Sequence, residues 1–166
     1  MVARLLKHLF MPAWLMLKYF PSRLLQEIES AIRESESLHR GEIRFAVEAS
    51  LPLPAVWKQV SGRHAAIEAF ANLRVWDTED NSGVLIYLLL ADRNIEIVAD
   101  RGIAAKVDEA EWENIAKLME QHYRAGDFRT GSIEGIGRVT ALLAQHFPPG
   151  NDNPNELSDR PVLLKR

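Results

Sequence analysis

The sequence predicts a mixed α/β fold, in which a βαβ unit and an antiparallel hairpin form one β-sheet sandwiched between helices. Three observations support this fold class. A continuous apolar run covers 84–90, an alternating segment at 42–48 precedes it, and amphipathic segments separate and follow the two. An apolar run of this length is typical of a central strand that is buried on both faces. A chain of 166 residues is the usual size of one domain.

The first half of the chain is expected to contain a helix, a strand and a second helix. Ser22 is a favourable N-cap, and apolar residues recur at helical spacing from there until Gly41. The alternation at 42–48 indicates a strand with one wet face or one at a sheet edge. After Pro54 a single helix is expected to reach about Asn72. Its buried stripe would comprise Val56, Val60, Ile67, Phe70 and Ala71.

The second half adds a hairpin and two helices. The strand at 84–90 ends in Asp92–Asn94, a turn sequence whose residues tolerate left-handed backbone angles. The strand at 95–98 then returns antiparallel to it. Because a helix joins the alternating strand to the apolar one, those two strands should be parallel. Helices are expected over 108–126 and 131–147, where apolar residues again recur at helical spacing.

The chain divides into three parts. Residues 1–20 form a basic, apolar segment, residues 21–147 form the α/β domain, and residues 148–166 form an expected flexible tail that opens with Pro, Gly and Asn. The first segment has no cleavage signal and is shorter than the roughly 20 apolar residues of a membrane span. Either it packs on the domain, or it lies on an anionic membrane surface or membrane protein complex, with Lys7 and Lys18 near the headgroups.

Composition excludes several classes of function. The chain has no cysteine, which rules out disulfides, thiolate metal sites and cysteine nucleophiles. The net charge is −3, but residues 1–26 carry +4, so the remainder carries −7. An acidic body argues against nucleic acid as a partner, because phosphate contacts need clustered Lys and Arg. The sequence contains no closely spaced histidine pair, nucleophile elbow or phosphate-binding glycine loop, and whether it is an enzyme stays open.

An acidic loop precedes the apolar strand, and its six consecutive side chains all carry oxygen. Ca²⁺ and Mg²⁺ prefer such ligands. Because the hairpin's second strand runs back along the first, Asp100-Arg101-Gly102 should lie at the same end of the sheet. The expected cation ligands are Asp77, Glu79, Asp80, Asn81 and Asp100. Arg101 and Ser82 are expected to bind a phosphate or another ligand.

Two plainer interpretations stay open beside this site. The acidic loop can be a solvated turn whose side chains cap backbone amides. Arg101 can neutralise that loop in a salt bridge, while Gly102 permits the turn. Two functions are accordingly considered, a binding or assembly module and a metal-dependent phosphatase-like hydrolase.

The hairpin resembles that of the TPM domain family. Residues 81–93, which read Asn-Ser-Gly-Val-Leu-Ile-Tyr-Leu-Leu-Leu-Ala-Asp-Arg, are similar to its Asp-Asn-Gly-Val-Leu strand and tight turn, and Asp100-Arg101-Gly102 stands at its Gly-Tyr-Gly-like exit. The order of elements fits over 22–147. The family includes thylakoid-lumen and photosystem II repair proteins and many bacterial proteins. The resemblance implies its α/β fold, and suggests Ca²⁺ binding, acid phosphatase activity and upkeep of membrane protein complexes.

This chain departs from the family pattern at the loop ends. Asn81-Ser82-Gly83 stands where the family has Asp-Asn-Gly, so an amide replaces one carboxylate. That change weakens the phosphatase expectation and leaves cation binding to Asp77, Glu79, Asp80 or Asp100. Many members carry a signal peptide or a membrane helix, and neither is recognisable here. The resemblance therefore suggests a short bacterial cytoplasmic branch that is peripheral to a membrane.

Overall fold

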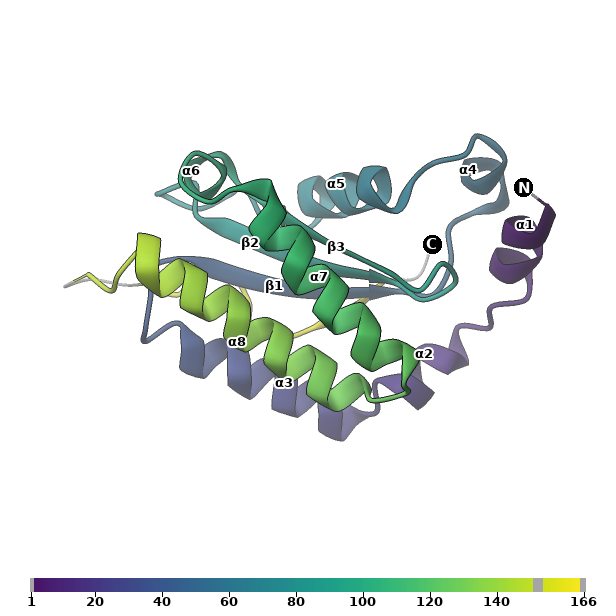
Figure 1. The fold of residues 1–166 in the computed structure, drawn as a ribbon, viewed down its shortest axis with the longest axis horizontal. Helices are drawn as coiled ribbons and strands as arrows, with labels where there is room; N and C mark the ends of the chain where they lie inside the picture. Colours follow the sequence, from purple (N-terminus) through teal and green to yellow (C-terminus); the bar gives the residue numbers. More distant parts are fainter. Residues whose placement is uncertain (1, 151–153, 165–166) are drawn as a thin grey trace.

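The computed structural model describes residues 2–150 and 154–164, and within them one four-stranded sheet carries helices on both faces (Figure 1). The strand order is β3-β2-β1-β4. β1 (Glu42–Glu48) lies parallel to β2 (Gly83–Leu89), and β2 pairs antiparallel with β3 (Asn94–Ala99). The expected fold class, a mixed sheet between helices built from a βαβ unit and a hairpin, is confirmed.

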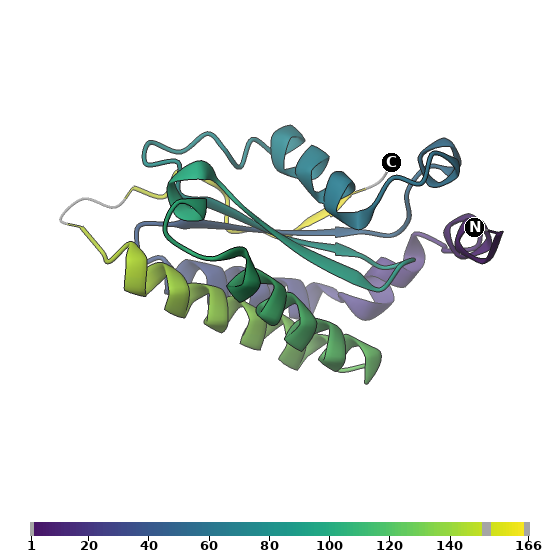
Figure 2. The same ribbon diagram turned by 45° about the horizontal axis from the view of Figure 1, so that its top comes forward.

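The helices form two layers. α3 (Ser22–Ser35), α7 (Glu109–Arg124) and α8 (Phe128–His146) cover one face of the sheet, as Figures 1 and 2 show. α4 (Leu53–Trp57) and α5 (Gly62–Asn72) cover the opposite face. Side chains on the two sides of each strand therefore enter two separate apolar clusters, which explains why the β2 sequence is apolar throughout.

The expectation that the strand at 42–48 has a wet face is wrong. All seven residues of β1 are buried, including the charged side chains of Glu42, Arg44 and Glu48. The reason is that β1 lies inside the sheet, between β2 and β4, with helices above and below. Each charged side chain has a polar partner there, such as the Tyr87 hydroxyl, which donates to Glu48 Oε2 at 2.5 Å.

The single helix expected after Pro54 is two helices. Gln59 adopts a left-handed backbone angle, with φ of 58°, and this ends α4. Ser61 then caps α5 by accepting the His64 N–H at 3.1 Å. The buried face of α5 is made of alanines rather than of the larger residues expected, and Ile67 is 49% exposed. The small side chains let α5 lie close to the sheet. They are Ala65, Ala66 and Ala69.

Three short helices lie at the ends of the sheet. α1 (Val2–Leu9) lies beside α4, near the turn of the β2–β3 hairpin, and α2 (Trp14–Tyr19) leads into α3 (Figure 1). α6 (Arg101–Ala104) follows β3 at the opposite end. The two ends of the sheet therefore carry different features, the N-terminal helices at one end and the acidic loop with α6 at the other.

The expectation that residues 148–166 form a flexible tail is wrong for the C-terminal part of this segment, which the structure describes as a strand. Val162–Leu164 form β4, which pairs parallel with Ala46–Glu48 and extends the sheet. No strand pattern is recognisable in the sequence here, because three residues are too few to show alternation. Residues 151–153, at the start of this segment, lie outside the described residues.

Buried polar groups hold the returning segment to the domain. The carboxylate of Glu42 accepts the backbone N–H groups of Glu156 and Leu157 at 3.2 and 3.1 Å. Arg33 donates to Asp159 at 3.2 Å. Burial, reinforced by the carboxylates of Glu42 and Asp159, raises the pKa of the neighbouring Glu36 to about 8. A nearly neutral Glu36 therefore sits among these carboxylates near pH 7.

Candidate functional site

The acidic loop and the exit of β3 meet at one end of the sheet, as the hairpin geometry predicted. The register places Val84 opposite Ala99, so the residues just outside this pair are neighbours. The Asp100 N–H donates to the Gly83 carbonyl at 2.8 Å, and the Gly102 N–H donates to the Asn81 carbonyl at 3.1 Å. The two loops are thus joined directly by backbone hydrogen bonds.

Gly102 is required by this close approach. A Cβ atom at this position would lie 2.5 Å from the Asp80 carbonyl oxygen and 2.8 Å from that of Asn81. Real Cβ atoms do not approach so closely, so only glycine lets the loops touch. Asn81 itself has φ of 51°, a left-handed angle that asparagine tolerates well. The residue types at these two positions are therefore explained by the meeting of the loops.

Asp100 is the most buried carboxylate of the two joined loops. It is 6% exposed, and its Oδ1 accepts the Arg101 N–H at 2.7 Å, which caps α6. Its Oδ2 is buried and has no hydrogen-bond partner among the described residues. An acceptor left in this state costs free energy, because water is lost and nothing replaces it. The Asp80 and Asn81 carbonyl oxygens of the acidic loop lie against Gly102, two residues further along the chain.

The remaining acidic side chains do not converge on Asp100. Asp80 binds Arg40 at 3.1 Å, and Asp77 binds Arg74 at 2.8 Å. No three His, Asp or Glu side chains of the described chain are arranged as ligands of one ion. Glu79 takes part through its backbone N–H, which donates to a tail carboxylate. The arrangement is a loop braced by arginines, with one buried carboxylate beneath it.

The two expected ligand-binding residues have different environments. Ser82 is fully buried, and its hydroxyl donates to the Arg40 carbonyl at 3.2 Å. The Arg101 guanidinium is largely exposed and donates to Asn81 Oδ1 at 3.2 Å. Ser82 thus supports the loop, whereas Arg101 is accessible to a ligand from solvent.

A second candidate surface lies at the other end of the sheet, on α1 and α2. The inner face of α1 is polar, because Arg4 and His8 both contact Asp92 in the hairpin turn, at 2.8 and 3.1 Å. The Leu51 N–H donates to Nδ1 of His8, so Nε2 carries the proton that faces Asp92. The outer face is apolar. We call it the N-terminal apolar face, and it comprises Val2, Leu6, Leu9, Phe10, Trp14 and Leu17.

The N-terminal segment therefore both packs on the domain and exposes apolar surface. Met16 and Phe20 are almost completely buried in the main core. In contrast, Phe10 is 73% exposed and Trp14 61% exposed. Hydropathy of the segment indicates this surface, but only the structure assigns each side chain to a face. Among the described helices, none combines the length and apolar character needed to cross a bilayer.

Together, the four-stranded mixed sheet, its helical layers and the loop pair at one end define a small α/β domain. Residues 18–142 match the family described as the TPM domain, and this chain belongs to that family. The predicted family is thereby confirmed at the level of the domain.

Solved structures support the same assignment. One similar structure is the BA42 protein of the psychrophilic bacterium Bizionia argentinensis, determined by NMR. It is 27% identical, with a TM-score of 0.75, and the match covers 86% of this chain and 93% of that one. The N-terminal domain of a P. gingivalis protein shares the fold alone, at 16% identity and a TM-score of 0.61, over 78% and 82% of the two chains. None of the curated proteins matches this sequence significantly.

Proposed function

We propose that this chain is a binding and assembly module that docks peripherally on an anionic membrane surface. The observation that carries the proposal is the outward orientation of the N-terminal apolar face. A surface helix normally turns its apolar residues to the core and its polar residues to water. In α1 the polar residues Arg4 and His8 face the domain, and the apolar residues face out. Exposed apolar surface of this kind marks an interaction site.

Charge favours an anionic bilayer as the partner. Lys7 and Lys18 are exposed within the same segment, and residues 1–26 carry +4. The remainder of the chain carries −7, so anionic headgroups attract the first segment and repel the body. Amphipathic helices of this kind lie in the headgroup region with their apolar side chains in the acyl boundary. The domain would then stand on the membrane through α1 and α2, with the acidic loop directed away.

Vesicle flotation tests this proposal. We expect the protein to float with vesicles of phosphatidylcholine that contain about 30 mol% phosphatidylglycerol, and much less with pure phosphatidylcholine. The double substitution L6D/F10D should reduce binding by at least about tenfold, because it removes two apolar contacts with the acyl region. I67D is the matched control, since Ile67 is an exposed apolar residue on α5. Equal flotation of the double variant and the control would refute membrane docking.

A second candidate function is divalent-cation binding at the joined loops. The specific observation that favours it is the buried Asp100 Oδ2, which lacks a partner among the described residues. Oxygen donors nearby include the Asn81 side-chain amide and the carbonyl groups of the acidic loop. Hard cations use this donor set. Asp80 would join it by leaving Arg40, while Asp77 and Glu79 would contribute negative charge around it.

An NMR titration with Ca²⁺ and with Mg²⁺ separates this candidate from a purely structural loop. We expect shifts confined to 77–83 and 99–103, and their loss in D100N. E34Q is the control, because Glu34 is an exposed carboxylate on α3 that lies outside both loops. If D100N and the unmodified protein respond alike, Asp100 is not a ligand.

A metal-dependent acid phosphatase activity would use the same site, with Arg101 as the ligand of the phosphate group. We rank it below cation binding because the Ser82 hydroxyl is buried and bound to the Arg40 carbonyl, so it is not placed to contact a substrate. Hydrolysis of p-nitrophenyl phosphate with Ca²⁺, Mg²⁺ or Mn²⁺ tests it. Turnover that R101A abolishes would support the phosphatase, and absence of turnover would exclude it for this substrate.

A further inference from the structure

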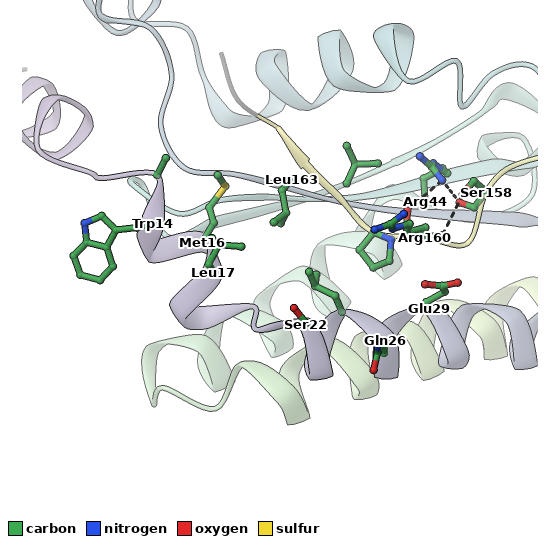
Figure 3. A pocket seen from close by; sticks show the side chains of 14 residues that line it. Trp14, Met16, Leu17, Ser22, Gln26, Glu29, Arg44, Ser158, Arg160 and Leu163 are labelled. Carbon is green, nitrogen blue, oxygen red and sulfur yellow. Dashed lines mark hydrogen bonds between the residues drawn. The ribbon is translucent and has the colours of Figure 1, made fainter.

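A large groove lies at the edge of the sheet that the three-helix layer leaves open. It has a volume of about 1070 Å³ and runs between α2–α3 on one side and β4 with the chain leading into it on the other (Figure 3). This volume is slightly above the roughly 300–1,000 Å³ that small-molecule sites usually occupy. The groove does not include the acidic loop, and it shares only Trp14 and Leu17, at its open end, with the N-terminal apolar face.

One end of the groove is cationic. Arg44 on β1 and Arg160 before β4 lie close together there (Figure 3). Arg44 is 9% exposed, and its guanidinium donates to the carbonyl oxygens of Ser158 and Arg160. Within the described chain, neither arginine forms an ion pair with a carboxylate. Burial lowers the pKa of Arg44, as expected for a cation without a close anion, although Asp159 acts in the opposite direction.

The nearby acids do not balance these two arginines. Glu29 and Asp159 are both bound to Arg33, at 2.8 and 3.2 Å. Glu36, also close to Asp159, is largely protonated near pH 7 because of its raised pKa. A buried guanidinium is stabilised when an anion approaches it. This end of the groove is therefore suited to a carboxylate.

The lining away from the arginines is mostly apolar, although the α3 wall also presents Ser22, Gln26 and Glu29 (Figure 3). Leu25 of α3 and Leu163 of β4 both line it, and Leu17 and Trp14 of α2 continue the lining away from the arginines (Figure 3). Leu17 is 59% exposed, so this end opens to solvent. The lining thus changes from charged to apolar along one direction. A ligand that matches it has one acidic end and one hydrocarbon chain.

We propose that this groove binds a long-chain carboxylate, with its head group at Arg44 and Arg160 and its chain along Leu25, Leu163 and Leu17. The groove has one cationic end and one apolar stretch leading from it, so a ligand with one acidic head group and one hydrocarbon chain matches it. The proposal goes beyond membrane docking, because it concerns a single bound ligand molecule whose head group lies at residues outside the N-terminal apolar face, with Leu17 the one residue that the two proposals share.

Titration calorimetry with three probes below their micellar concentrations tests both ends of the groove. Oleate should bind with a stoichiometry of one, oleyl alcohol at least about tenfold more weakly because it lacks the charge, and acetate not detectably because it lacks the chain. R160E should weaken oleate binding by at least about tenfold. R138E is the control, since Arg138 is an exposed arginine on α8. The oleate affinity of R138E should stay within about twofold of that of the unmodified protein.

Equal oleate affinities of R160E and R138E would overturn the proposal, as would equal affinities for oleate and oleyl alcohol. Methyl NMR on the unmodified protein gives an answer that does not depend on the folding of a variant. Oleate should shift the methyl signals of Leu25 and Leu163. Shifts confined instead to Leu118 and Leu142, which line a separate surface groove between α7 and α8, would place the ligand elsewhere and refute the assignment. R160E should still float with anionic vesicles, which distinguishes failure of this site from failure of membrane docking.

Discussion

Arg4 and Asp92 lie 88 residues apart in the chain, and the guanidinium of Arg4 contacts the carboxylate of Asp92 through both Nε and a terminal nitrogen, at 2.8 to 3.2 Å. The same guanidinium donates to the Val60 carbonyl at 2.7 Å. Burial raises the pKa of Asp92, but the hydrogen bonds from Arg4 and His8 outweigh it and leave that pKa below the usual value of 3.8. The contact fixes α1 to the hairpin turn, and so sets which face of α1 points outward.

We expect D92N to release α1 from the domain. The free energy of unfolding should fall by about 1.5–3 kcal/mol, the usual contribution of a hydrogen bond to a charged group. Hydrogen exchange should accelerate at 2–9 more than in β2. R23A is the control, because Arg23 forms an exposed pair with Glu27, and its effect should stay within about 0.5 kcal/mol.

Because the folded-state pKa of Asp92 is lowered, the stabilising contribution of its carboxylate is complete above pH 3.8 and disappears as the pH falls through the folded-state pKa. A difference between D92N and the unmodified protein that persists below that value would contradict this.

Two glycine substitutions should have opposite effects. G102A places a Cβ against the backbone of Asp80 and Asn81, at 2.5 and 2.8 Å, and backbone cannot move aside cheaply. We expect a loss of about 1–3 kcal/mol in the free energy of unfolding. G137A, inside α8 with no atom within 4 Å of the added Cβ, should instead stabilise by about 0.5–1 kcal/mol. Urea denaturation measures both, and a neutral G102A would mean that the loops separate without cost.

The contribution of Glu36 to the stability of the protein should fall as the pH rises from about 4.5 to about 8. Its folded-state pKa of about 8 lies above the ordinary 4.5, so the folded state binds more protons than the unfolded state between these values. E36Q removes this pH dependence. The difference in melting temperature, E36Q minus the unmodified protein, should therefore increase between pH 4.5 and about 8 and stay constant above pH 8. E34Q, an exposed change on the same helix, serves as the control. A pH-independent difference between E36Q and the unmodified protein would show that Glu36 does not titrate in this range.

Removal of residues 154–166 should expose the edge of β1. The truncated chain loses the pairing of Ala46–Glu48 with β4 and the backbone N–H groups that Glu42 accepts. Unpaired strand edges bind other chains, so we expect a lower melting temperature and concentration-dependent association in analytical ultracentrifugation. A synthetic peptide of residues 154–164, added in excess, should restore the monomer. A truncated chain that stays monomeric with unchanged melting would contradict this role of β4.

Local sequence patterns predicted the central fold because its elements satisfy those patterns themselves. The apolar run of β2 and the turn before Asn94 needed no distant partner to be recognised. Three features depended on distant residues or on backbone angles and were missed. β1 looked half-exposed because its covering segment is 114 residues away, the break at Gln59 depends on a backbone angle, and β4 is too short to show periodicity.

The candidate site was predicted in outline and not in detail. Hairpin register alone required Asp100 and Arg101 to lie beside the acidic loop, and they do. Which carboxylates would face one another could not be predicted. Arg40 approaches Asp80 from 40 residues away, a tertiary contact that composition and spacing do not reveal. Arg74 pairs with Asp77 only three residues later, through a turn in which Arg74 adopts a left-handed backbone angle.

The position of β4 has a consequence for synthesis. Arg44 can donate to the Ser158 carbonyl only after another 114 residues have been made, so β1 leaves the ribosome long before its covering strand. At roughly 5–20 residues per second, this delay is about 6–23 s. During that time one side of β1 is an open strand edge, and its arginine lacks the carbonyl groups that it contacts in the folded domain. Nascent chains of this protein should therefore depend on chaperones more than the size of the domain suggests.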